Sequence, residues 1–388
     1  MTIPPERLLH LTASSVNSSN RLTVVYPLFR AMKILLLSRY SWAGGSRIRS
    51  LSYIPLLERD GLEVTVAPLM DDRYVDRYYA GRSTDWPRLF VLYLRRVRDL
   101  LSAGKFDLVW IERETLPYLP AFPEWLLSRL GIPYVIDYDD AIFHNYDSHR
   151  RWIVRTTLGR KIDKVMQYAR MVIVGNDYLA ERARRAGANC IEYLPTAVDL
   201  RGIDATIQPQ NDVFTVGWIG TPANARYLAP IAPALEEICK NGTGRVVTIG
   251  ARKRDLGGIN GDIRKWSLET ESADIQSFDV GIMPLPDTPF ERGKCGYKLL
   301  QYFACGRPAI ASPVGVNCKI VDHGVNGFLA STITEWIEAL TALKNNASLR
   351  QSMGALGRKK IEGHYSLLDT APRLASLLKR AAQPANAL

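Results

Sequence analysis

The chain has 388 residues, more than one hydrophobic core of ordinary size encloses, so two domains of about 150–200 residues each are expected. With 47% hydrophobic and 23% charged residues it has the composition of a globular protein, and no apolar run reaches the roughly 18 residues of a membrane span, which excludes an integral membrane protein. A net charge of +11 favours an anionic partner such as a nucleotide phosphate, anionic lipid or nucleic acid. Five cysteines without a Cys-x-x-Cys pair indicate neither a disulfide framework nor a structural zinc site, and they fit a reducing cytoplasm.

The chain begins with a stretch that lacks a clear structural pattern. Residues 1–31 contain no hydrophobic core of signal-peptide type and are expected to be an unstructured extension. A buried strand is expected at residues 33–38, followed by a turn at Gly44 and Gly45 and a helix over 46–61 that Ser46 caps. Two adjacent glycines let the backbone approach a ligand closely, although a Gly-Gly pair alone is more often only a turn.

Strands and helices then alternate, which predicts a parallel sheet with crossover connections. The strands are expected at residues 63–69, 107–112, 134–137 and 171–174. Two helical segments between them, 86–105 and 149–170, are unusually basic, and Arg88, Arg95 and Arg98 fall on one face of the first. A solvated basic face and a surface that meets anionic lipid both account for these arginines.

Three carboxylates stand at the end of the strand at 134–137. Asp137, Asp139 and Asp140 lie where open α/β sheets keep their ligand sites, and Glu112, Arg113 and Glu114 follow the neighbouring strand as further candidates for the same cleft. Carboxylates so close together repel unless they meet cations, hydrogen-bond donors or sugar hydroxyls. Metal binding by these aspartates is the alternative interpretation.

A second strand-and-turn unit follows a polar linker at residues 201–212. A strand is expected to start at Phe214 and to end in a glycine turn at Gly220 and Thr221, with a helix from about Arg226. Further strands are expected at residues 245–249 and 266–269.

Residues 278–330 are the most informative stretch. Val280 to Met283 is a buried-strand candidate, and the prolines after it require an open loop, which carries Glu291, Arg292, Lys294 and Lys298. A mostly apolar helix then starts at Gly296 and stops at Gly306, and a short buried strand is expected at 309–312. A basic loop that enters a helix behind a buried parallel strand favours an anion, so a phosphate is the expected ligand.

These residues resemble the donor-binding core of retaining nucleotide-sugar glycosyltransferases of the two-domain GT-B type, a group with many bacterial polysaccharide and lipopolysaccharide transferases. Residues 304–311, ACGRPAIA, are similar to the group's Ala-x-Gly-x-Pro-Val-Ile-Ala segment, and Pro195 to Asp199 resembles its Pro-Asn-Gly-Val-Asp segment. The chain departs from the group at its two signature glutamates, which are replaced by Gly293 and Gln301. Lys298 stands three residues before Gln301, as the lysine of the Lys-Leu-x-Glu variant does.

The resemblance implies an α/β fold of two Rossmann-like domains that face each other across a cleft. The acceptor domain would span residues 32–205 and the donor-nucleotide domain residues 206–365, and a C-terminal helix in 366–388 would cross back to the first domain. The group's His-Asp pair aligns with Asp139 and Asp140.

The implied activity is transfer of a sugar from a nucleotide diphosphate sugar to a glycan or lipid-linked acceptor with retention of anomeric configuration, without metal or other cofactor. The expected catalytic residues are Asp139, Asp140, Glu291 and Lys294. The expected donor-binding residues are Gly44, Gly45, Gly220, Thr221, Asn224, Lys294, Lys298 and Gln301. The expected location is cytoplasmic, on the inner face of the membrane, with an anionic membrane surface as a further partner.

Two other classes stay open from the sequence. Because both signature glutamates are displaced, a non-catalytic sugar-nucleotide-binding homologue is one alternative. A nucleic-acid-binding protein would fit the positive charge, but no nucleic-acid-binding motif accompanies it, so no nucleic acid partner is expected.

Overall fold

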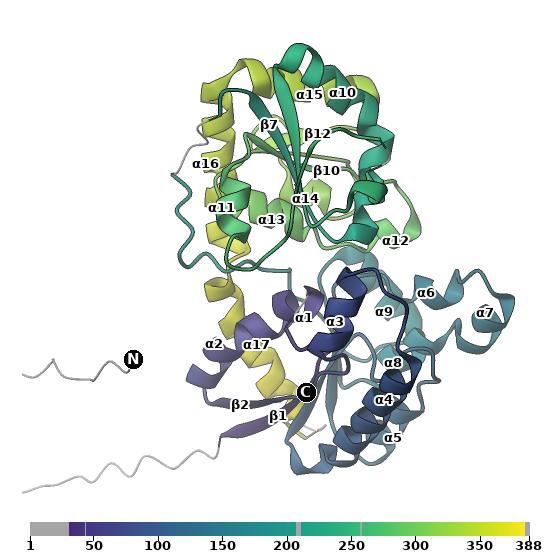
Figure 1. Ribbon diagram of the computed structural model, residues 1–388. Coiled ribbons are helices and arrows are strands. Elements are labelled where there is room, and N and C mark those ends of the chain that lie inside the picture. The colour runs from purple at the N-terminus through teal and green to yellow at the C-terminus, as the bar shows by residue number, and fades with distance from the viewer. Residues whose placement is uncertain (1–30, 43, 207–210, 257, 385–388) are drawn as a thin grey trace, which may run out of the picture. The chain divides into compact units, whose positions relative to one another are not determined.

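Two parallel β-sheets, each covered by helices, form the body of the protein in the computed structural model (Figure 1). The structure describes residues 31–42, 44–206, 211–256 and 258–384. The extension predicted over residues 1–31 lies, except for its last residue, outside these ranges. The predicted α/β fold of two Rossmann-like domains is confirmed.

The first sheet has the strand order β2-β1-β3-β4-β5-β6, and every neighbouring pair is parallel. The long apolar runs seen in the sequence form its centre, because strands covered on both faces are apolar throughout. Its strands are β1 (Met32–Leu37), β2 (Leu62–Val66), β3 (Leu108–Glu112), β4 (Tyr134–Tyr138), β5 (Met171–Val174) and β6 (Ile191–Tyr193). The five strands predicted for this part of the chain are confirmed within a few residues.

Helices cover both faces of the first sheet. The helices of this part of the chain are α1 (Gly44–Arg49), α2 (Ile54–Arg59), α3 (Asp72–Tyr79), α4 (Trp86–Leu101), α5 (Phe122–Arg129), α6 (His144–Asp147), α7 (Trp152–Leu158), α8 (Lys161–Tyr168) and α9 (Asp177–Ala186), with short 3-10 turns η1 (Leu51–Tyr53) and η2 (Ala103–Lys105). On one face, Leu127 of α5, Ile162 of α8 and Leu179 of α9 join a core cluster with β3 and β4. Leu57 of α2 belongs to the cluster on the opposite face.

The second sheet repeats the architecture with the order β12-β11-β10-β7-β8-β9, again parallel throughout. Its strands are β7 (Phe214–Ile219), β8 (Gly244–Ile249), β9 (Asp262–Arg264), β10 (Val280–Met283), β11 (Ala309–Ala311) and β12 (Gly327–Leu329). Its helices are η3 (Pro222–Ile231), α10 (Ala232–Cys239), η4 (Lys240–Gly242), η5 (Lys253–Asp255), α11 (Glu271–Gln276), α12 (Pro289–Arg292), α13 (Tyr297–Ala304), α14 (Asn317–Ile320), α15 (Ile333–Asn345) and α16 (Ala347–His364).

Helix α13 is placed by its flanking glycines. Gly296 precedes it with a φ of 71°, and Gly306 follows it with a φ of 66°, conformations that favour glycine. Between them Leu299, Leu300 and Phe303 are fully buried against the second sheet. The helix therefore starts at the carboxyl edge of β10, with Lys298 in its first turn.

The last helix, α17 (Leu367–Ala382), packs against the first sheet although it follows the second in sequence. Leu374 and Leu378 are fully buried in the core cluster that holds Ile34 and Leu36 of β1, and Figure 1 shows the helix, in yellow, beside α2. The domain limits at residues 205 and 365 remain predictions. None of the described helices combines the length and apolar character that a membrane crossing requires.

Three local predictions were wrong. The helix predicted over 46–61 is broken at Ser50, whose φ and ψ of −134° and −56° separate α1 from the turns that follow. Ser46 does not cap it, because its hydroxyl lies inside α1 and hydrogen-bonds to Glu112 and to the Tyr40 amide. The strand predicted at 266–269 lies earlier in the chain, as β9, and Trp266 follows it in a loop.

Candidate functional site

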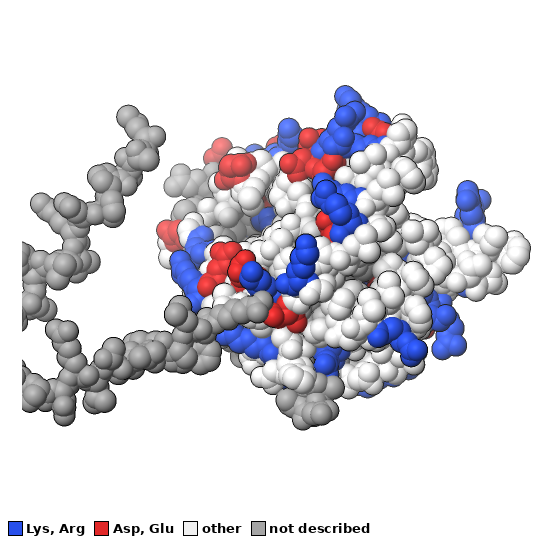
Figure 2. Space-filling model, turned by 90° about the horizontal axis from the view of Figure 1, so that it is seen from below, with Lys and Arg blue, Asp and Glu red and all other residues white. Residues whose placement is uncertain are grey.

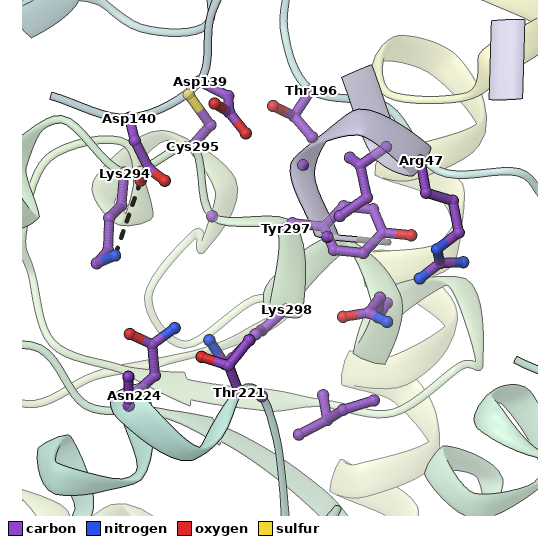
Figure 3. Close-up of a pocket in the computed structure, with 18 of the residues that line it drawn as sticks. Arg47, Asp139, Asp140, Thr196, Thr221, Asn224, Lys294, Cys295, Tyr297 and Lys298 are labelled. Carbon is purple, nitrogen blue, oxygen red and sulfur yellow. Dashed lines mark ion pairs between the residues drawn. The ribbon is translucent and has the colours of Figure 1, made fainter. Parts of the chain in front are cut away.

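A cavity of about 430 Å³ opens at the carboxyl ends of the strands of both sheets. Its first wall comes from the segments after β1, β3 and β4, and its second from those after β7 and β10 (Figure 3). Of the residues predicted for catalysis and donor binding, all but one line it: Gly44, Gly45, Asp139, Asp140, Gly220, Thr221, Asn224, Lys294, Lys298 and Gln301. Carboxyl ends of parallel strands are where open α/β sheets bind ligands.

The carboxylates at the carboxyl end of β4 are each met by a cation, which offsets their mutual repulsion. Asp137 is buried and accepts two hydrogen bonds from Arg49, at 2.6 and 3.3 Å. Asp139 accepts from Arg113 at 2.7 Å, and the same guanidinium reaches Asp140 at 3.3 Å. The backbone of Arg113 has a φ of 65°, unusual for a residue other than glycine. This conformation stands at the edge of the cavity, where backbone strain is often functional.

Asp139 and Asp140 differ in charge environment despite being neighbours. Burial raises the pKa of Asp139, but Arg113 and Arg49 more than offset it, so this pKa lies below its usual range. Burial and the adjacent Asp139 raise the pKa of Asp140, although Lys294 and Arg113 act against them. The two pKa values are thus pushed apart, and Asp139 is the more firmly ionised of the pair while Asp140 is the more readily protonated.

Two lysines supply positive charge to the opposite wall. Lys294 Nζ lies 3.7 Å from Asp140, and Figure 3 shows the two side chains pointing at each other from different domains. Lys298 lies over the Trp218 ring, with its Nζ 5.6 Å from the ring centroid. Burial and the nearby Lys294 lower the pKa of Lys298 to about 8. An incoming anion would meet both cations at the start of α13, where free backbone N–H groups also favour negative charge.

The glycine turns bring the backbone close to this space. At Gly45, an added Cβ would lie 2.8 Å from an Arg113 nitrogen and 2.9 Å from an Asp139 oxygen. At Gly220, it would lie 2.9 Å from Lys298 Cε. Both positions therefore need glycine to leave the charged side chains in place.

Glu291 is the predicted site residue that does not line the cavity. It is buried, and its carboxylate accepts hydrogen bonds from the hydroxyls of Tyr227 and Thr288. Since both oxygens are engaged, its position suits support of the loop that carries Lys294. The catalytic role predicted for Glu291 stays a prediction.

The two positions that lack the signature glutamates differ in their surroundings. At Gly293 an added Cβ would lie 2.4 Å from the Cβ of Ala141, so the first domain leaves no room for a side chain there. Asn176 of the first domain fixes this point by donating to the Gly293 and Lys294 carbonyls, at 2.8 and 3.1 Å. Gln301 keeps a polar group in the cavity wall, but an uncharged one.

Sequence reasoning missed a group of residues at one edge of the cavity. Arg47 of α1 donates to Glu271 at 3.0 Å and lies 5.6 Å from the Trp266 ring centroid. Trp266 donates to Glu271 at 2.6 Å and stacks on Trp42, with the rings inclined by 9°. The only local signal was the arginine directly after the glycine turn, and nothing near it in the sequence pairs it with residues more than 200 positions away.

Comparison with known proteins supports the interpretation of the second domain. The sequence model of the family described as glycosyl transferases group 1 matches residues 210–346, which include β7 to β12 and both lysines. Residues 210–346 are therefore similar to the group 1 glycosyl transferases. The family resemblance found in the sequence is therefore confirmed. No curated protein sequence is significantly similar to the chain.

Solved structures match this region together with the first domain. Sucrose-phosphate synthase from Thermosynechococcus elongatus has a TM-score of 0.68 at 15% identity, over 90% of this chain and 98% of its own. Anabaena HepE in complex with UDP-glucose has a TM-score of 0.64 at 14% identity, over 90% of this chain and 99% of its own. A UDP-forming α,α-trehalose-phosphate synthase from Burkholderia xenovorans has a TM-score of 0.62 at 15% identity, over 91% of this chain and 100% of its own. At these identities the similarity establishes the two-domain GT-B fold.

Proposed function

We propose that the protein transfers a sugar from a nucleoside diphosphate sugar to an acceptor, with retention of configuration at the anomeric carbon. The observation that carries the proposal is that the two walls of the cavity have opposite charge. Lys294 and Lys298 form a cationic wall on the second domain, and Asp139 and Asp140 form an acidic wall on the first. A diphosphate suits the first wall and sugar hydroxyls suit the second.

The chemistry needs stabilisation of the departing diphosphate. When the bond from the anomeric carbon to the diphosphate oxygen breaks, negative charge grows on the leaving group and positive charge on the sugar ring. Lys294, Lys298 and the first turn of α13 would stabilise the negative charge on the diphosphate. Asp139, kept ionised by Arg113, would stabilise the positive charge on the sugar ring and hold a sugar hydroxyl. In this proposal the lysines do the work that a divalent metal would do elsewhere, so no metal is required.

The nucleotide is proposed to be uridine diphosphate. Two of the structurally similar proteins are described as a complex with UDP-glucose and as a UDP-forming synthase. The sugar is proposed to be a hexose, as in the UDP-glucose of that complex, and Gln301, with 6% of its surface exposed, would bind the ribose or the sugar.

The acceptor is proposed to be a growing glycan or a lipid-linked sugar of bacterial polysaccharide or lipopolysaccharide synthesis. The exposed arginines at the start of α7, Arg150, Arg151 and Arg155, favour an acceptor presented at the cytoplasmic face of a membrane. This part of the proposal places the enzyme on the membrane surface without a spanning segment.

Two measurements test the proposal in order. Thermal shift with a panel of nucleoside diphosphates should give the largest stabilisation with UDP, because ligands that bind the folded state stabilise it by mass action. Incubation with UDP-sugars and a lipid-linked glycan acceptor should then release UDP and give an α-linked product from an α-linked donor. Binding without release of UDP from any donor would instead identify a non-catalytic sugar-nucleotide-binding protein.

A further inference from the structure

The outward side of α4 is more apolar than basic. Large apolar side chains recur there every three or four residues and form one stripe. Their exposed fractions are 72% for Trp86, 66% for Phe90, 53% for Leu94, 42% for Val97 and 80% for Leu101. The helix packs inward through other residues, since Leu92 is buried. A stripe of large apolar side chains pointing into solvent is unusual for a globular protein and marks an interaction surface.

A second apolar stripe lies on α5. Phe122, Leu126 and Leu130 are spaced four residues apart and are 60%, 37% and 65% exposed, with Trp125 beside them. Aromatic residues make up much of both stripes. Such residues are enriched where a protein surface meets the interface of a bilayer.

Contacts between neighbouring segments place α4, the loop before α5 and the segment before α7 next to one another. Tyr93 of α4 donates to the carbonyl of Pro117, just before α5. The ring of Tyr118 in the same loop lies 5.4 Å from Tyr146 and 6.2 Å from His149, which leads to α7. On α7, Trp152 and Ile153 are 67% and 54% exposed. We call the outward residues of α4, α5, α7 and the loop at 118–119 the apolar face.

Positive charge borders the apolar face. Arg129 lies over the Trp125 ring at 5.9 Å, and Arg150, Arg151 and Arg155 surround the start of α7. Viewed from below, the right-hand part of the molecule shows a broad uncharged surface with blue side chains at its edges, and the red side chains gather to the left and at the top (Figure 2). Lysine and arginine around an apolar patch are complementary to anionic headgroups around an acyl layer.

The structure corrects which basic residues take part. Arg88 forms an ion pair with Asp71, and Arg95 donates to the Pro68 carbonyl. Lys161 is buried and pairs with Glu114. Of the three arginines predicted to act together on α4, Arg98 keeps most of its side chain exposed, at 79%. The electrostatic attraction of α4 to an anionic membrane is therefore weaker than its sequence indicated. Its exposed apolar side chains offer more surface for insertion into the bilayer.

We propose that the apolar face inserts into the interface of a bilayer that contains anionic lipid. A second copy of the chain fits less well, because a two-fold contact between identical faces would bring like-charged arginine borders together. Membrane binding itself does not depend on the proposed function. Only the benefit of binding rests on it, since insertion would bring the acceptor domain to a lipid-linked acceptor. The residues that line the donor cavity and those that form the apolar face are separate sets.

Co-sedimentation of the full chain with vesicles tests the proposal without requiring turnover. The vesicles are pure phosphatidylcholine, or phosphatidylcholine with phosphatidylglycerol, at low and high salt. We expect binding to the anionic vesicles, with a measurable part surviving high salt because apolar insertion is not screened. The triple variant Phe90→Gln, Leu94→Gln, Leu101→Gln should lower the partition coefficient at least about tenfold.

Matched variants separate apolar insertion from attraction by charge and from self-association. Leu356→Gln and Leu368→Gln change residues that are 42% and 61% exposed on α16 and α17, and should leave vesicle binding unchanged. Arg150→Gln with Arg151→Gln should weaken binding at low salt only. Equal binding of the triple variant and the wild type overturns the proposal. So does a wild-type dimer in lipid-free buffer that the triple variant converts to a monomer, since the face would then join two copies. UDP binding, measured in parallel by thermal shift, reports on the proposed function separately.

Discussion

Arg47 in α1 hydrogen-bonds to both carboxylate oxygens of Glu271 in α11, at 3.0 and 3.3 Å, and so joins the first domain to the second across the edge of the cavity. The pair is mostly shielded from solvent, with side chains 19% and 11% exposed. It closes the cavity on the side where Trp42 stacks on Trp266.

Breaking this contact should let the two domains separate. We expect Glu271→Gln to increase the radius of gyration of the ligand-free protein in solution scattering. A double-mutant cycle that combines Glu271→Gln with Arg47→Ala and measures the free energy of unfolding should give a coupling of about 0.5–3 kcal/mol, the range for residues in direct contact. Glu237→Gln, which alters an exposed ion pair with Lys240, is the control. Additive effects of the two substitutions would show that the contact carries no coupling.

Lys294 and Lys298 should each contribute to diphosphate binding. Changing either to alanine is expected to weaken UDP binding by roughly 1.5–3 kcal/mol, the range for a hydrogen bond to a charged group. Isothermal titration calorimetry measures this directly. Lys359→Ala, on the exposed side of α16, removes the same charge elsewhere and should have no effect. Unchanged affinity in both cavity variants would contradict the assignment of this wall to the diphosphate.

UDP affinity should depend on pH through Lys298. Its pKa in the free protein is about 8, below the ordinary 10.5, and a bound diphosphate favours the protonated lysine. Affinity should therefore be highest below pH 8 and fall above it, by about tenfold per pH unit at most, the slope for uptake of one proton. Lys298→Arg should flatten the profile, because arginine stays charged. The same decline in wild type and variant would assign the titration to another group.

Gly45→Ala should disturb the acidic wall without changing any charge. The added methyl would lie 2.8 Å from Arg113 and 2.9 Å from Asp139, so their ion pair must shift. We expect kcat for sugar transfer to fall about tenfold or more, as small displacements of positioned groups commonly cost. Gly104→Ala, whose nearest neighbour is Ile132 at 3.9 Å, tests the effect of the substitution itself. Wild-type kcat for Gly45→Ala would mean that the Arg113–Asp139 geometry is not needed.

Turnover should survive an excess of chelator, because cations already meet the aspartates at the carboxyl end of β4. Transfer assays with and without EDTA, followed by added Mg²⁺ or Mn²⁺, check this expectation. Activity that is lost in EDTA and restored by either ion would favour the alternative in which Asp137, Asp139 and Asp140 bind metal.

The sequence predicted the strands well because buried parallel strands are continuous apolar runs. Residues 134–137, 171–174 and 280–283 illustrate this, since each forms a strand close to those bounds. The strand prediction at residues 266–269 was wrong because Trp266 and Leu268 alternate with polar residues, as the residues of a half-buried strand do. Its tryptophan is instead held by Trp42 and Glu271, contacts between distant segments that no local pattern reveals.

The site was predictable where glycine turns and lysines mark strand ends, and not where partners come from distant segments. The crowding of carboxylates indicated a need for cations near Asp137, but Arg49 lies 88 positions away in sequence. Likewise, the loss of the glutamate at Gly293 makes physical sense only once Ala141 is seen against it. The exposed stripe on α4 was equally hidden, since periodicity locates an apolar face without saying whether anything covers it.

The return of α17 to the first sheet also constrains how the protein is made. Helix α17 buries Leu374 and Leu378 against β1, and the returning chain pairs with the outgoing one where Val198 bonds to Tyr365 and Leu367. During synthesis the residues that start the first sheet leave the ribosome first, but the helix that covers them leaves last. The part of that sheet face that α2 does not cover must therefore stay exposed while the whole second domain is translated and folds. The newly made chain is for that interval a natural client for chaperones, and a stop codon before residue 367 would make that state permanent.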